Sequence, residues 1–310
     1  MLSVIIPAYN EEKCIKPAYN AIQSLLAENN IESEFIFVND GSQDGTYGQI
    51  NELSVEKENI VGLHFSRNFG KESAISAGLA AVSGDCAVVL DCDLQHPPEK
   101  IIEMYRLWEE GYEIVEGIKK ERGQEKKMYS VGAKFFYSVI SRMAGFDMAN
   151  SSDFKLLDRK VVDVLNNMPE RGFFRAMSYW VGYNKATVEY DVRERVDGES
   201  KWSASGLIKY ALSNISSYST APMQTVTVLG FAMLIISVIF GVWALVDKIS
   251  GRALEGMTTV IIITIFIGSI IMISLGIIGY YIARIYEEIK GRPKYIISSS
   301  VKSDKKNKCV

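Results

Sequence analysis

The sequence predicts an α/β domain with a doubly wound, mostly parallel sheet, followed by an amphipathic interfacial helix and two transmembrane helices. Short β-branched runs alternate with helix-length amphipathic stretches in the first two thirds of the chain, and two long uncharged stretches follow. Near-continuous apolar runs such as 87–90 indicate strands that are buried on both faces. Such strands are typical of a parallel sheet that is covered by helices on both sides.

Several segments have the length and composition of strands, and helix-length segments separate the first five of them. The expected strands are Leu2–Pro7, Glu34–Asn39, Ile60–Phe65, Cys86–Leu90, Glu113–Glu116, Phe154–Leu157 and Ala186–Tyr190. In doubly wound sheets, ligands bind beyond the carboxyl ends of the strands. The polar residues directly after each strand are therefore the first candidates for a site.

Two uncharged stretches, Ala211–Val246 and Gly256–Ala283, each exceed the roughly 20 apolar residues that a membrane-spanning helix needs. Long core helices are the alternative. The spacing of apolar residues in Ala204–Tyr218 predicts an amphipathic helix lying on the membrane, with a core helix as the alternative. We divide the chain into an α/β domain (1–202), an interfacial helix (203–221), a membrane hairpin (222–283, with spans at 222–246 and 257–283) and a basic tail (284–310).

The distribution of basic residues predicts the orientation of this hairpin. Eight Lys or Arg residues follow the second span, whereas the loop between the spans holds Lys248 and Arg252. The positive-inside rule then places both termini in the cytoplasm. The first residues form a strand and do not resemble a signal peptide, so we expect a multi-pass protein of the cell (inner) membrane with a cytosolic catalytic domain. The Ser- and Lys-rich tail from Ser298 is expected to be disordered.

Charge and cysteine content argue against a nucleic-acid-binding protein and against a zinc-binding protein. The net charge is -3 and no long basic stripe occurs in the first two thirds, so nothing indicates capture of nucleic acid. The four cysteines have neither CxxC nor zinc-type spacing, and only two histidines accompany them. We expect reduced structural thiols.

Asp91 and Asp93 follow a buried strand and are separated by one residue. With a bend in the chain, both carboxylates can face one cation. Mg²⁺ or Mn²⁺, held by one or two carboxylates and the phosphates of a substrate, suits such ligands and would neutralise a departing nucleoside diphosphate. An Asp-x-Asp pair is common by chance, but its position after a strand and before Gln95 and His96-Pro97-Pro98 strengthens the prediction.

Further motifs occur in a fixed order around this pair. They are Val4–Glu12, Val38–Thr46, Ser66–Lys71, Asp91–Pro98, Ser152–Arg159, Arg195–Trp202 and Gly291-Arg292-Pro293. On these motifs, nearly the whole chain resembles the family 2 inverting glycosyltransferases. Within that family it resembles the group that uses polyprenyl phosphates, which includes dolichol-phosphate mannosyltransferases and bactoprenol glucosyltransferases.

The resemblance implies a GT-A type nucleotide-sugar-binding sheet and a role for individual residues. The implied nucleotide-sugar-binding residues are Pro7, Tyr9, Glu11, Asp40, Arg67, Lys71 and Asp91, and the implied metal ligands are Asp91, Asp93 and Gln95. Arg195, Ser200 and Lys201 fall in the family's acceptor-phosphate region, for which a solvated charged turn is the alternative. For Lys71 the alternative is a charged residue that merely begins a helix. The charged segment Lys119–Lys127 indicates a surface loop or lid, and we assign its Arg122, Lys126 and Lys127 to the acceptor phosphate as well.

Asp153 matches the family position that is discussed as the catalytic base, and with Asp93 it is our candidate catalytic residue. The second pKa of a phosphate monoester is about 6, so a polyprenyl phosphate attacks at neutral pH without losing a proton. We therefore expect Asp153 to orient the acceptor or the sugar as much as it removes protons. An unshielded carboxylate would also repel the dianionic acceptor.

The implied reaction transfers a sugar, first of all glucose from UDP-glucose, to undecaprenyl phosphate with inversion. Mannose, N-acetylhexosamine, galactose and aminoarabinose are the alternatives. Many mannosyltransferases of the group carry Gly-Ser-Arg where this chain has Gly117-Ile118-Lys119, which argues against assuming mannose. A processive synthase would need a Gln-x-x-Arg-Trp motif and more spans, and a catalytically silent membrane scaffold would not need the three aspartates. The resembling bacterial enzymes and the two lone spans favour a homo-oligomer.

Overall fold

The computed structural model describes residues 1–119, 152–168, 174–191 and 257–302, together with single positions between 232 and 250. The chain divides into two compact units, one formed by Met1–Trp202 with Pro293–Val310 and the other by Ser203–Arg292. The predicted interfacial helix (203–221) and most of the first predicted span (222–246) lie outside the described residues.

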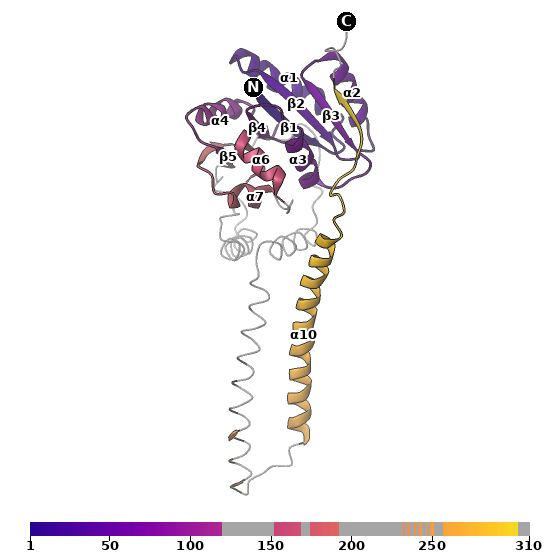
Figure 1. Cartoon of the computed structure of the whole chain (residues 1–310), viewed down its shortest axis with the longest axis vertical. Helices are drawn as coiled ribbons and strands as arrows, with labels where there is room; N and C mark the ends of the chain where they lie inside the picture. Colours follow the sequence, from indigo (N-terminus) through magenta and orange to yellow (C-terminus); the bar gives the residue numbers. More distant parts are fainter. Residues whose placement is uncertain are drawn as a thin grey trace. The chain divides into compact units, whose positions relative to one another are not determined.

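The first unit is built on one sheet of eight strands in the described residues (Figure 1). In chain order the strands are β1 (Leu2–Ala8), β2 (Ser33–Asn39), β3 (Ile60–Phe65), β4 (Cys86–Val89), β5 (Ile114–Lys119), β6 (Lys155–Asp158), β7 (Lys185–Tyr190) and β8 (Ile297–Lys302). Their spatial order is β7-β5-β6-β4-β1-β2-β3-β8. The central pairs β4-β1, β1-β2 and β2-β3 are parallel, as is β5-β7, whereas β6 runs antiparallel to both of its neighbours. The predicted α/β sheet is thus confirmed as a mixed sheet.

Helices cover both faces of the sheet because the strands alternate their buried side chains between two cores. Leu2, Val4 and Ile6 of β1 pack with α1 (Ile15–Glu28), α2 (Thr46–Glu56) and α4 (Glu99–Glu109). Ile5 points to the other face, where α3 (Lys71–Ala80), α6 (Arg159–Asn167) and α7 (Phe174–Trp180) pack. The helices thus cover the two faces of the sheet and leave the carboxyl ends of the parallel strands uncovered.

The C-terminal segment returns to the first unit, and for residues 298–302 this corrects the prediction of a disordered tail from Ser298. Strand β8 pairs antiparallel with β3, and in Figure 1 this yellow segment runs alongside β3. Tyr295 stacks on Phe65 with ring centroids 5.1 Å apart, and the backbone N–H of Ser66 donates to Ile296 O at 3.0 Å. Strand β8 lies at the edge of the sheet, where a Ser-rich strand can pair without a buried face, so composition alone was a poor guide here.

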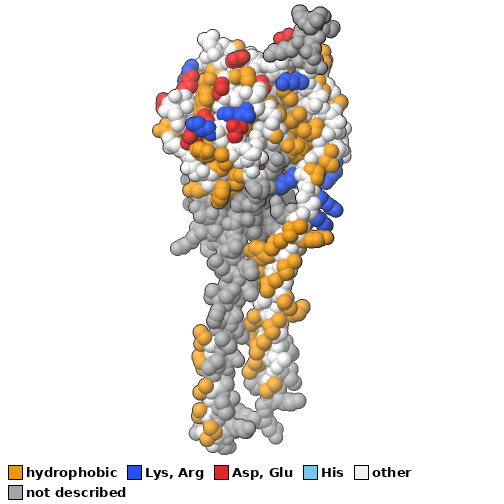
Figure 2. All heavy atoms as spheres, in the orientation of Figure 1, with side chains coloured by type: hydrophobic (Ala, Val, Ile, Leu, Met, Phe, Trp, Pro, Cys, Tyr) orange, Lys and Arg blue, Asp and Glu red, His pale blue; other side chains and the backbone are white. Residues whose placement is uncertain are grey.

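Helix α10 (Met257–Ile289) belongs to the second unit and contains the second predicted span. Its stretch Phe266–Ala283 has a mean hydropathy of 2.0 and is not buried, and the helix is long and apolar enough to cross a membrane. Figure 2 shows hydrophobic side chains along α10, whereas charges of both signs are mixed over the visible face of the first unit. Phe266 and Met272 are 55% and 69% exposed, which argues against a core helix within one chain. Among the described residues α10 is one such helix, and the first span stays a prediction.

Candidate active site

Four loops at the carboxyl ends of β1, β2, β3 and β4 surround one pocket of about 280 Å³. Its lining residues are Pro7, Ala8, Tyr9, Glu11, Asp40, Asn68, Gly70, Lys71, Ala74, Asp91, Cys92 and Asp93. The parallel central strands explain why segments so distant in sequence meet here, since their carboxyl ends all reach the same edge. The structure therefore brings together most of the residues that the sequence assigned to donor binding.

The loops after β1 and β2 are joined by hydrogen bonds that fix the backbone beside Tyr9. Asn10 adopts a left-handed conformation with φ 56°, which Asn tolerates better than most residues. Its backbone N–H donates to Ser42 Oγ at 2.9 Å, and its side-chain Oδ1 accepts from Gln43 N at 2.9 Å. Glu11 N donates to Thr46 Oγ1 at 2.9 Å. These hydrogen bonds hold the loops after β1 and β2 together at this side of the pocket.

Asp40 ties the loop after β3 to the same framework. Its two carboxylate oxygens accept from the backbone N–H groups of Phe69 at 2.7 Å and Gly70 at 2.9 Å. Burial raises the pKa of Asp40, and the two backbone donors partly offset this. Gly41 has φ 66°, and a Cβ there would lie 2.2 Å from the carbonyl carbon of Arg67, so only glycine permits the close approach of the two loops. Asp40 thus positions the start of α3 as well as lining the pocket.

Asp91 and Asp93 lie together on the pocket after β4, as predicted. The bend that follows them is set by Leu94, whose φ of 55° is unusual for a bulky residue, and by the N–H of Gln95, which donates to Asp93 Oδ1 at 3.1 Å. Among the described residues no three His, Cys, Asp or Glu side chains form a metal-ligand group. Two carboxylates on one pocket fit a divalent cation that shares its coordination with a diphosphate, but not a cation that the described part of the protein would hold alone.

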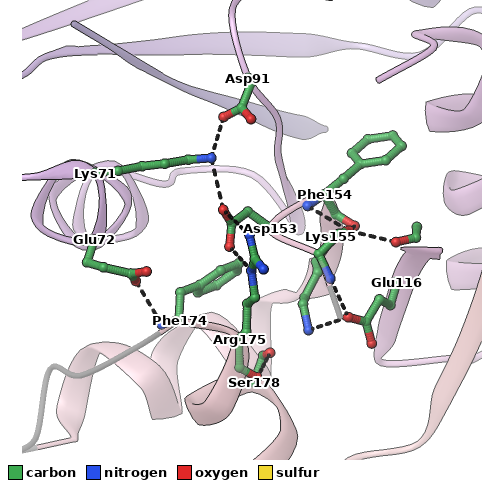
Figure 3. A network of polar contacts seen from close by, with 12 residues as sticks. Lys71, Glu72, Asp91, Glu116, Asp153, Phe154, Lys155, Phe174, Arg175 and Ser178 are labelled. Atoms are coloured by element: carbon green, nitrogen blue, oxygen red, sulfur yellow. Dashed lines mark hydrogen bonds and ion pairs between the residues drawn. The ribbon is translucent and has the colours of Figure 1, made fainter. Parts of the chain in front are cut away.

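Lys71, the first residue of α3, joins the donor pocket to Asp153 (Figure 3). Its Nζ lies 2.6 Å from Asp91 Oδ1 and 2.9 Å from Asp153 Oδ2. Burial lowers the pKa of Lys71, but the two carboxylates outweigh it and hold that pKa above its usual value. In Asp91, burial raises the pKa and the Lys71 ammonium more than compensates, so the carboxylate stays ionised. Lys71 therefore begins a helix and pairs with a predicted metal ligand at the same time.

Asp153 lies just before β6, is 6% exposed, and is held by a second cation as well. Arg175 of α7 makes two contacts with it, Nε to Oδ1 at 2.7 Å and one terminal nitrogen to Oδ2 at 3.0 Å (Figure 3). Burial raises the pKa of Asp153, but Lys71 and Arg175 together lower it far below its usual value. At neutral pH this carboxylate is an ionised partner of two cations and a weak base.

Comparison with known proteins agrees with this geometry. The sequence model described as "Glycosyl transferase family 2" matches residues 3–165. An uncharacterized glycosyltransferase of Synechocystis sp. is 38% identical over 300 residues, covering 96% of this chain and 94% of that protein. The chain belongs to glycosyltransferase family 2. Within this family, a bactoprenol glucosyl transferase of Shigella phage SfII is 36% identical over 302 residues, covering 96% of this chain and 98% of its own.

Solved structures share the fold of this family 2 glycosyltransferase. Glucosyl-3-phosphoglycerate synthase from Mycobacterium tuberculosis, solved with Mn²⁺, UDP and phosphoglyceric acid, matches with a TM-score of 0.51 at 20% identity, covering 69% of this chain and 76% of that chain. The complex of the same enzyme with Mn²⁺, UDP and glucosyl-3-phosphoglycerate matches with a TM-score of 0.50 at 21% identity and covers 69% and 77%. At this identity the likeness establishes the GT-A type fold alone.

Two charged residues of this glycosyltransferase were missed by the sequence analysis. Arg175 lies 22 residues beyond Asp153 and looks like an ordinary polar position of a short helix, so no sequence signal could have found it. Glu72 follows Lys71, and its Oε2 accepts from Phe174 N at 2.8 Å. Burial and the neighbouring charge of Asp153 raise the pKa of Glu72 to about 7, against the opposing effect of the Phe174 N–H, Arg175 and Lys71.

The remaining predicted residues have different outcomes. The guanidinium of Arg67 lies over the Phe69 ring, 4.1 Å from its centroid, and Arg67 is not among the residues that line the pocket. Gln95 is likewise not among them, and its backbone N–H donates to Asp93. The predicted acceptor-phosphate residues lie outside the described residues: Arg122, Lys126, Lys127, Arg195, Ser200 and Lys201. Among the described residues, Cys14, Cys86 and Cys92 are buried thiols outside any disulfide, which agrees with the expected reduced state.

Proposed function

We propose that this glycosyltransferase moves glucose from UDP-glucose to undecaprenyl phosphate, with inversion, at the cytoplasmic face of the cell membrane. The observation that carries the proposal is the pocket that joins the nucleotide-binding loops to Asp91 and Asp93, in a chain that is 36% identical over nearly its whole length to bactoprenol glucosyl transferases. The apolar helix α10 supports a membrane location, where a long prenyl chain presents its phosphate.

Residues of this chain take separate tasks in the proposed reaction. Tyr9, Glu11 and Asp40 line the side of the pocket that we assign to the nucleoside. Asp91 and Asp93 would hold Mg²⁺ or Mn²⁺ together with the donor's diphosphate, and such a cation neutralises the charge that the leaving group develops. The solved synthase complexes contain Mn²⁺ with UDP, which agrees with this assignment but does not distinguish the two metals.

The acceptor needs no strong base in this reaction. The phosphate oxygen attacks the anomeric carbon and the bond between that carbon and the UDP oxygen breaks. One of the two negative charges of the acceptor phosphate remains on the new phosphodiester, and UDP leaves with one more negative charge than it carried in the donor. Because Asp153 is ionised and paired with two cations, we assign to it the positioning of Lys71 and Arg175. The acceptor phosphate is assigned to the charged residues outside the described ranges, which lie in segments 120–151 and 192–202.

The full chain in detergent, supplied with undecaprenyl phosphate and radiolabelled UDP-glucose, tests the proposal. Labelled lipid is expected with Mn²⁺ or Mg²⁺ and not with EDTA, and undecaprenol without its phosphate serves as the control acceptor. Label from UDP-N-acetylhexosamine, UDP-galactose, an aminoarabinose donor or GDP-mannose in place of UDP-glucose would change the sugar but keep the reaction. Absence of labelled lipid with every donor would favour a non-catalytic membrane scaffold.

Two further parts of the proposal concern membrane topology and oligomeric state. We assign the chain two membrane spans with both termini cytoplasmic, and a homo-oligomeric state in which the spans associate. Labelling of single cysteines introduced at Ala253 and Ser303 in intact cells distinguishes the sides of the membrane. Light scattering of the detergent-solubilised protein, with the detergent contribution subtracted, gives the number of subunits.

A further inference from the structure

The feature that carries this inference is the position of the Lys71 ammonium on a predicted metal ligand. Nζ lies 2.6 Å from Asp91 Oδ1, a distance at which the ammonium and the carboxylate are in direct contact. The same nitrogen lies 2.9 Å from Asp153 Oδ2, so one cation contacts two carboxylates, one in the loop after β4 and the other just before β6 (Figure 3).

The backbone of Lys71 has little freedom to withdraw from this position. Lys71 is the first residue of α3, and the preceding Gly70 has φ 95°, in the region that favours glycine. The N–H groups of Phe69 and Gly70 are both held by Asp40. Only the side chain can move, and it has four rotatable bonds.

A divalent cation on Asp91 and the ammonium of Lys71 compete for the same carboxylate. Asp91 and Asp93 bring two negative charges to the pocket, and Lys71 already compensates part of the charge of Asp91. Two cations within a few ångströms repel each other strongly in a partly buried pocket, where Asp91 and Lys71 are 35% and 41% exposed. A diphosphate adds negative charge on which both cations can lie, and this relieves the repulsion.

We propose that Lys71 is an internal counterion of Asp91, and that it disfavours a divalent cation on this carboxylate until a diphosphate binds. The inference rests on the proposed metal site at Asp91 and Asp93. Because binding couplings are reciprocal, the charge on Lys71 makes Mn²⁺ and UDP each strengthen the binding of the other. When a diphosphate binds, the Lys71 ammonium leaves Asp91 but keeps its contact with Asp153, which is not a proposed metal ligand.

Titration of the full-length protein with Mn²⁺, followed by the electron paramagnetic resonance signal of free Mn²⁺, tests this without any transfer reaction. The Lys71→Met variant is expected to bind Mn²⁺ about tenfold or more tightly than the wild type in the absence of UDP. Its affinity for Mn²⁺ in the presence of UDP is expected to fall or stay unchanged. The tighter binding without UDP separates the counterion from a residue that only binds diphosphate, whose loss leaves the affinity for Mn²⁺ alone unchanged.

Three further variants make the test decisive. Lys71→Arg keeps the charge and should bind Mn²⁺ alone as weakly as the wild type, whereas Lys71→Gln removes the charge but keeps a hydrogen-bond donor and should behave as Lys71→Met does. Lys16→Met removes a lysine that pairs with Glu52 away from the pocket, and it should leave Mn²⁺ binding unchanged. Thermal melting of each variant identifies general loss of structure, which would weaken binding with and without UDP.

The outcomes separate this inference from the proposed function. If the wild type binds no Mn²⁺ even with UDP, the metal site at Asp91 and Asp93 is wrong. If the wild type binds Mn²⁺ with UDP, but Lys71→Met and Lys71→Gln bind Mn²⁺ alone no more tightly than it does, only the counterion is wrong. Micromolar binding of Mn²⁺ by the nucleotide-free wild type would overturn the counterion directly, without reference to any variant.

Discussion

Replacing Arg175 by Ala tests whether the buried Asp153 depends on two cations. The substitution removes two contacts of 2.7 and 3.0 Å to a carboxylate that is 7% exposed. Hydrogen bonds to charged groups contribute about 1.5–3 kcal/mol each to stability. Because Lys71 still pairs with Asp153 and the Arg175 side chain is 34% exposed, we discount the sum to about 2 kcal/mol.

Thermal unfolding of the full chain, followed by tryptophan fluorescence, measures this loss. For a unit of this size, about 2 kcal/mol lowers the Tm by roughly 4–8 °C. The control is Arg106→Ala, which removes an exposed ion pair with Glu109 on α4 and should lower the Tm by less than about 2 °C. On an Asp153→Asn background, Arg175→Ala should cost much less than on the wild type, because the charge that it neutralises is absent.

The pH dependence of this effect follows from the lowered pKa of Asp153. A carboxyl group whose folded pKa is depressed contributes stability above its unfolded pKa of about 3.9 and loses it only as the pH falls through the folded value. The Asp153 part of the Tm difference between Arg175→Ala and the wild type should therefore persist from pH 8 down to pH 5, and because Arg175 also lowers the pKa of Glu72, the whole difference should be somewhat larger at pH 8 than at pH 5. A difference below 2 °C at neutral pH, or one that disappears between pH 7 and 5, would refute the reasoning.

Three other predictions concern neighbouring parts of the site. Burial raises the pKa of Glu72 to about 7, so its contribution to stability is present below about pH 4.5 and is lost as the pH rises towards 7; Glu72→Gln should raise the Tm relative to the wild type at pH 8 but not at pH 4.5. In Gly70→Ala the new Cβ meets no neighbouring atom, but the residue must keep φ 95°, so the free energy of unfolding should fall by about 1–2 kcal/mol and calorimetry should show weaker binding of UDP with Mn²⁺. The control Gly48→Ala also places its Cβ in open space and should cause neither effect. Tyr295→Ala removes the ring stacked on Phe65 and should lower the Tm by several degrees, and an unchanged Tm would mean that the C-terminal segment does not stabilise the catalytic unit.

The fold was largely predictable because the strands are short, apolar and separated by amphipathic helices. Ile60–Phe65 was predicted with the bounds that β3 has, and the other predicted strands differ from the observed ones by a few residues at their ends. Strand β8 was missed because a Ser-rich edge strand has no buried face to give it an apolar pattern. Its pairing with β3 depends on contacts more than 200 residues apart, such as that of Ser298 Oγ with His64 O.

The site was predictable where local chemistry coincides with the end of a strand. Asp40, Asp91 and Asp93 all lie at such positions, and the topology of a parallel sheet brings them together. Arg175 could not be found in this way, because its partner Asp153 is set by the packing of α7 against the sheet and not by any spacing in the sequence. Lys71 was predicted to bind the nucleotide sugar, but its contact with Asp91 was not predicted, because that contact depends on how far the lysine side chain reaches.

The pairing of Asp153 with two cations also resolves a difficulty in the proposed reaction. A carboxylate beside a dianionic acceptor would repel it, and a carboxylate that accepts a proton at neutral pH would need a raised pKa. Asp153 instead has a lowered pKa, and Lys71 and Arg175 compensate its negative charge. Because Lys71 also contacts Asp91, two cations here balance two carboxylates, and Asp153 presents no uncompensated negative charge to an approaching phosphate. A phosphate that is already ionised needs this arrangement more than it needs a base.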